Sequence, residues 1–107
     1  MPKILDLSKK KPVLPVKLPD DTLIRVYTPT KGMLEEFITI GAQLEHAADD
    51  SDALNQLYEV TARLMNNNAG GRKLSLKEVS DMLDVGDIIV FFRAYTEFIT
   101  ELSKAKN

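Results

Sequence analysis

The segment from residue 84 to residue 102 constrains the fold of this chain more than any other part. It reads Asp-Val-Gly-Asp-Ile-Ile-Val-Phe-Phe-Arg-Ala-Tyr-Thr-Glu-Phe-Ile-Thr-Glu-Leu and holds four of the seven aromatic residues in the sequence. Its apolar residues recur at the spacing of an amphipathic helix. So much apolar surface on one helix must be covered, either by the core of the chain itself or by a partner.

The main apolar stripe of this helix is as wide as a core-facing helix needs, roughly 120° of arc. Ile89 and Val90 fall outside the stripe, on the side shared with Arg93 and Glu97. We interpret them as candidate contacts for another subunit or a client protein, and the alternative is burial under the third helix or the hairpin. The stripe itself consists of Ile88, Phe91, Phe92, Tyr95, Phe98, Ile99 and Leu102.

Length and composition indicate a single globular domain over residues 1–107. The chain has 107 residues, of which 44% are hydrophobic and 28% are charged, and these values are ordinary for one domain with one core. The formal net charge is only -2. Because nucleic-acid binding depends on a basic surface, the sequence argues against a nucleic-acid partner.

The absence of certain residue types and segments excludes several kinds of site and of cellular location. There is no cysteine, which removes disulfides, thiolate metal ligands and thiol nucleophiles and favours a reducing compartment. No apolar stretch approaches the roughly 18 residues of a membrane-spanning helix. The first residues lack the apolar core of a signal peptide. We therefore expect a cytoplasmic protein that does not bind membranes.

Residues 1–28 predict an arm followed by a β-hairpin. Residues 1–12 mix lysines with a short apolar patch and form a possible flexible arm. Residues 13–18 and 22–27 have the composition of strands and flank Pro19-Asp20-Asp21, which is typical of a tight turn. Pro15 has no N–H to donate to a neighbouring strand, so the first strand should lie at an edge.

A helical part is predicted over residues 29–104, beginning where Thr28-Pro29-Thr30 can start and cap a helix. Met33 and Ile40 lie off the main stripe of this first helix. They are candidates for contact with another protein, and the alternative is that they widen the core face. The main stripe consists of Leu34, Phe37, Ile38, Gly41, Leu44, Ala47 and Ala48.

Three further helices follow, which gives an α+β fold that is predominantly helical and packs as a small bundle. The aspartates of residues 49–52 end the first helix and cap the second. Asn66–Lys73 is a polar loop containing two glycines, and we interpret it as a mobile hinge. Ser75 with Glu78 matches a capping box at the start of the third helix, and Asp84 can cap the fourth.

No set of residues has the pattern of an active site or a metal site. His46 is the only histidine, so it has no second histidine or cysteine with which to form a metal shell. The aspartates of residues 49–52 lack the glycine and glutamate of a calcium loop. Ser51 and Ser75 stand where caps are expected. We predict a protein that is not an enzyme and uses no cofactor.

The chain resembles the tail assembly chaperones of long-tailed, siphovirus-type bacteriophages and prophages. The resemblance lies in the order of short segments along most of the chain and not in one chemical motif. These segments are Leu18-Pro-Asp-Asp21, Thr28-Pro-Thr30, Leu57-Tyr58, Asn66 through Lys73, Phe91-Phe-Arg-Ala-Tyr95 and Phe98-Ile99.

The resemblance implies a non-enzymatic chaperone that binds the tape-measure protein and helps recruit tail-tube subunits during tail assembly. It further implies a homo-oligomer that works in the bacterial host cytoplasm and is absent from the mature virion. A longer form made by ribosomal frameshifting is common in this family, and Ala105-Lys106-Asn107 is compatible with an A-rich slippery site. The alternatives are a small phage or prophage structural connector and a protein-binding regulator.

Overall fold

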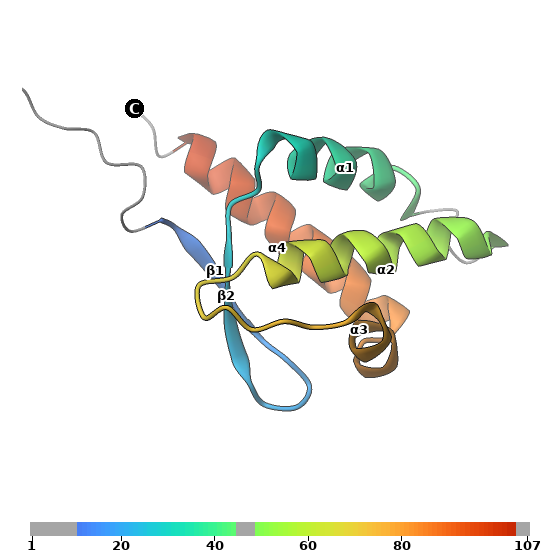
Figure 1. The fold of residues 1–107 in the computed structure, drawn as a ribbon. Coiled ribbons are helices and arrows are strands. Elements are labelled where there is room, and N and C mark those ends of the chain that lie inside the picture. The colour runs from blue at the N-terminus through green and yellow to red at the C-terminus, as the bar shows by residue number, and fades with distance from the viewer. Residues whose placement is uncertain (1–10, 45–48, 105–107) are drawn as a thin grey trace, which may run out of the picture.

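The computed structural model describes residues 11–44 and 49–104. A hairpin comes first and four helices follow, so the α+β, mainly helical class predicted from the sequence is confirmed (Figure 1). Expectations for residues 1–10, for His46 and for residues 105–107 lie outside the described residues. In order, the elements are β1 (Val13–Lys17), β2 (Leu23–Tyr27), α1 (Lys31–Gly41), α2 (Ser51–Asn66), α3 (Leu76–Met82) and α4 (Val85–Lys104).

The hairpin turn has the three-residue form that its sequence predicts. Leu18 N donates to Thr22 O at 2.8 Å, and Asp21 N donates to Leu18 O at 2.8 Å. Asp21 adopts a φ of 70°, a left-handed conformation that aspartate tolerates better than most residues. The Asp20 carboxylate accepts hydrogen bonds from Thr22 N and from Thr22 Oγ1, at 3.1 Å and 2.6 Å, and fixes the turn.

Only one of the two edges of the hairpin is covered by another part of the described chain. The loop after α2 covers β2, because Tyr27 N donates to Asn67 O and Ala69 N donates to Arg25 O, both at 2.8 Å. The sheet has only the two strands β1 and β2. Within the described residues, β1 therefore forms the uncovered edge, as Pro15 predicts.

Side-chain caps start the helices where the sequence predicts them. The Thr30 side chain accepts from Met33 N at 3.3 Å at the start of α1. Ser75 and Glu78 form a reciprocal capping box at the start of α3, with distances of 2.9 Å and 3.1 Å. Each such cap satisfies backbone N–H groups that the helix leaves without a partner. Asp50 caps α2 in the same way, and Asp84 caps α4.

Helix α1 is shorter than its apolar stripe predicts. The stripe was expected to continue to Ala48, but α1 ends at Gly41. Gly41 carries a high conformational entropy cost in a helix, and directly after it Gln43 N donates to Ile40 O at 2.9 Å, three residues back. The chain therefore leaves the helix in a tight turn at its glycine.

The loop of residues 66–73 is held by asparagine side chains, which argues against the mobile hinge that its composition predicts. Asn66 Nδ2 donates to Leu74 O at 2.9 Å, and Asn66 Oδ1 accepts from Leu74 N at 2.6 Å. The buried Asn68 side chain donates to Met65 O and Arg72 O, both at 2.8 Å, and accepts from Arg72 N at 3.1 Å. These bonds fix the loop from both ends.

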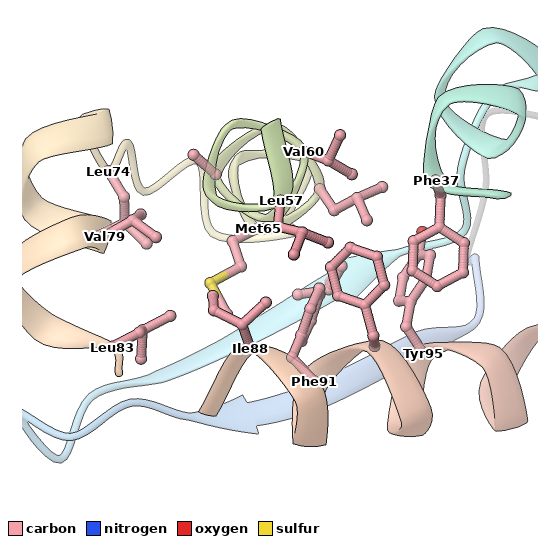
Figure 2. Close-up of a cluster of buried hydrophobic side chains, with 14 of the residues drawn as sticks. Phe37, Leu57, Val60, Met65, Leu74, Val79, Leu83, Ile88, Phe91 and Tyr95 are labelled. Atoms are coloured by element: carbon pink, nitrogen blue, oxygen red, sulfur yellow. The ribbon is translucent and has the colours of Figure 1, made fainter. Parts of the chain in front are cut away.

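One cluster of buried side chains joins β2 to all four helices. Figure 2 shows Ile88 and Phe91 pointing from α4 toward α2, and Tyr95 lying beside Phe37, which approaches from α1. The sequence-predicted core stripe of α4 is thus confirmed for its first half, where Ile88 and Tyr95 are almost fully buried. Its second half is only half-buried, so the core ends before the helix does.

Replacing Asn68 by alanine tests the loop network. Asn68→Ala removes three hydrogen bonds and leaves backbone groups without partners, so we expect a loss of about 2–3 kcal/mol in the free energy of unfolding. Urea unfolding followed by circular dichroism measures this change. Lys73→Ala, at an exposed position of the same loop, is the control and should change stability by less than about 0.5 kcal/mol. Equal effects of the two variants would contradict a pinned loop.

Candidate protein-binding surfaces

Several polar side chains of the structure have structural roles. Over residues 11–44 and 49–104, no group of three or more His, Cys, Asp or Glu residues is placed to hold a metal ion. Hydrogen bonds from Thr22 and Arg72 lower the pKa of Asp20 to about 2, which keeps this exposed carboxylate charged as an anchor of the turn. Glu36 forms an ion pair with Arg63 between α1 and α2. None of the described helices is both long and apolar enough to cross a membrane.

The four candidate contact residues are placed differently by the fold. Val90 has 65% of its surface exposed, the largest value among the exposed large hydrophobic residues. Ile89 and Met33 are half-buried, and Met33 packs against the core. Ile40 is only 8% exposed and belongs to the core. The structure thus favours the core-face interpretation of Ile40, and Val90 is the candidate most accessible to another protein.

Ile38 is the exposed apolar residue of α1, and the sequence interpretation had placed it in the core stripe. Its side chain is 61% exposed. The exposure of Ile38 and the burial of Ile40 have one cause: α1 is rotated about its axis so that Phe37 and Ile40 are its buried residues. Which side of a helix is buried depends on where its neighbours lie. In α1, apolar residues continue on both sides of the predicted stripe, so the sequence pattern does not specify which of them face the core.

An apolar groove lies between α1 and α4. It has a volume of about 650 Å³. Its floor contains Phe37 and Phe92, whose rings stack at a centroid distance of 4.7 Å. Because these large rings fill the space between the two helices, the backbones stay apart and leave a channel above them. The α1–α4 groove is lined chiefly by Leu34, Ile38, Leu44, Phe92 and Ile99.

Charged side chains stand at the rim of the α1–α4 groove. Arg93 and Glu97 are both exposed residues of α4 that line it. They are four residues apart, a spacing that often gives an ion pair on a helix. Among the described residues neither of them forms a salt bridge within 4.0 Å. Both charges are therefore available to the polar side chains of a partner bound in the groove.

A second groove lies on the other side of α4, between that helix and β1. Its volume is about 450 Å³. It is lined chiefly by Leu14, Val16, Leu18, Asp87, Val90 and Ala94. Val90 thus stands at the edge of the β1–α4 groove, and Ile38 lines the α1–α4 groove. Figure 1 shows α4 crossing the molecule diagonally, with α1 and the hairpin in different directions from it.

Comparison with known proteins identifies no relative of the chain. No protein-family model matches the chain, and neither a curated protein nor a solved structure matches it. The two grooves are therefore interpreted from their own geometry.

A matched pair of alanine variants tests the rotation of α1. Ile40→Ala should lower the free energy of unfolding by about 2–5 kcal/mol, since it creates a cavity in the core. Ile38→Ala should change it by less than about 0.5 kcal/mol, since the side chain is already in solvent. Urea denaturation provides both values. A large loss for Ile38→Ala with little effect of Ile40→Ala would mean that α1 packs through its other side.

Proposed function

We propose that this chain is a non-enzymatic tail assembly chaperone of a long-tailed bacteriophage or prophage. In this proposal it binds the tape-measure protein, helps recruit tail-tube subunits, and acts in the bacterial host cytoplasm without entering the mature virion. The family resemblance of the sequence supplies these partners. The observation that supports a binding role is the α1–α4 groove, with Ile38 exposed to 61% beside its aromatic floor.

The α1–α4 groove has the properties of a site for an amphipathic helix. Two helices form its walls, apolar side chains form its lining, and Arg93 and Glu97 stand at its rim. A client helix that lays its apolar face in such a groove buries that face and leaves its polar side in water. An elongated helical client offers many such segments, and several copies bound along it would keep it from aggregating.

Self-association is part of the proposal, because chaperone copies on neighbouring segments of one client come into contact. Exposed Val90, on the other side of α4, is available for a contact of this kind. Its burial is worth about 1.5–3 kcal/mol for a side chain that becomes fully covered. Val90→Glu should therefore weaken oligomerisation, and Ile38→Glu should weaken client capture.

Co-expression with the tape-measure protein encoded by the same phage or prophage tests the proposal. The tape-measure protein should be soluble only when this chain is present, and the two should purify together. Ile38→Glu should reduce the recovered client at least several-fold, because it places a charge in the apolar groove. Leu23→Glu is the matched control: Leu23 is a similarly exposed leucine, at 52%, in the hairpin and outside both grooves.

Two results would contradict the proposed function. One is a tape-measure protein that stays insoluble with the chain present, while circular dichroism shows that the chain is folded. The other is detection of the chain by mass spectrometry as a component of purified virions, which would indicate a structural connector instead.

A further inference from the structure

We propose that the uncovered edge of β1, together with the β1–α4 groove, binds an extended segment of a partner protein by strand addition. The bound segment would run antiparallel to β1, carry alternating apolar side chains, and have a basic residue at its amino-terminal end. This site is separate from the α1–α4 groove, and the inference does not rest on the proposed function.

The hydrogen-bonding pattern of the hairpin identifies which groups of β1 face outward. Leu18 and Thr22 form a hydrogen-bonded pair at the turn, and such pairs alternate with non-bonded pairs along an antiparallel ladder. Val16 and Leu14 therefore point their backbone groups toward β2. The backbone groups of residues 13, 15 and 17 point away from it, and no described residue bonds to them.

The pattern on β2 agrees with this assignment. Arg25 and Tyr27 lie opposite Pro15 and Val13, and their outward backbone groups bond to the loop after α2. The corresponding groups of β1 have no such cover among the described residues. Val13 and Lys17 offer an N–H and a C=O each, and Pro15 offers only its C=O.

The β1–α4 groove lies beside this edge and can take the side chains of an added strand. Leu14 and Val16 face it from β1, and Val90 and Ala94 face it from α4. A strand added to β1 would place alternate side chains on the same face as Leu14 and Val16. An apolar residue there would cover Val90, which is otherwise 65% exposed.

The charges of the groove distinguish its two ends. Its charged lining residues are Lys17 and Asp21, at the turn end of β1, and Asp87, in the first turn of α4. Lys17 already pairs with Asp21 at 3.5 Å, so the sum of the three charges is negative. The amino-terminal end of an antiparallel strand lies beside the end of β1, where a basic side chain would complement Asp87.

A second copy of the chain is a poor occupant of this edge. A two-fold pairing of β1 with β1 centred on Pro15 would face two residues that both lack an N–H. A pairing centred on Lys17 would bring two ammonium groups together, which is unfavourable between directly opposed residues. These two registers of self-pairing are thus disfavoured, whereas a different sequence meets neither obstacle.

Nuclear magnetic resonance titration of the full chain tests this site with two hexapeptides of identical composition. Both are acetylated and amidated and alternate threonine with valine; one begins with lysine and the other ends with it. The peptide that begins with lysine should shift the amide signals of Val13 and Lys17 and slow their hydrogen exchange. It should bind about two- to five-fold more tightly than the other, the range that a surface ion pair supports.

Three variants sharpen the test. Val90→Ser should weaken binding of both peptides about tenfold, because less apolar surface is covered. Asp21→Asn, which keeps a residue suited to the left-handed backbone, should abolish the preference for the peptide that begins with lysine. Ile38→Ser, in the other groove, should leave both affinities unchanged.

Several outcomes of the same measurements would overturn the inference. Peptide-induced shifts confined to the α1–α4 groove, or no shifts at all, would do so. Slow exchange of the Val13 and Lys17 amides in the free protein would also do so. Protection that rises with protein concentration would mean that a second copy occupies the edge. Protection that does not would mean that the chain covers its own edge.

Discussion

Tyr95 connects the three parts of the chain that define both grooves. Its ring contacts the Phe37 ring of α1 edge-on, at a centroid distance of 5.2 Å, and stacks on Phe91 at 5.5 Å. Its hydroxyl donates to Tyr27 O at the end of β2, at 3.1 Å. Burial raises the pKa of Tyr95, so the hydroxyl stays protonated and remains a donor. Tyr95 thus links α1 and the hairpin to α4 through one side chain.

The grooves follow from how α4 is packed. Large aromatic side chains, not close backbone contacts, fill the space between α4 and its neighbours, so surface channels remain on two sides of the helix. Ile38 lies in one channel and Val90 in the other. Helix α4 is thus a wall of both grooves. The α1–α4 groove is suited to a helix, and the β1–α4 groove is suited to an extended strand.

The features that the sequence predicted correctly are local ones. The hairpin turn at Asp21 and the capping box of Ser75 depend on residues within four positions of each other, and short-range chemistry specifies them. The rotation of α1, which exposes Ile38, depends on distant helices. The bonds of Asn68 depend on how the chain returns from Met65 to Arg72, and a polar composition does not reveal them. The grooves could not be predicted because their walls come from segments far apart in the chain.

A double-mutant cycle between Phe37 and Tyr95 tests most directly whether this aromatic contact sets the arrangement. Urea unfolding would be measured for the unmodified chain, for Phe37→Leu, for Tyr95→Leu and for the double variant. The contact predicts a favourable coupling of about 0.5–1.5 kcal/mol. Effects that add within about 0.3 kcal/mol would contradict it, since they would mean that α1 is held in place independently of Tyr95.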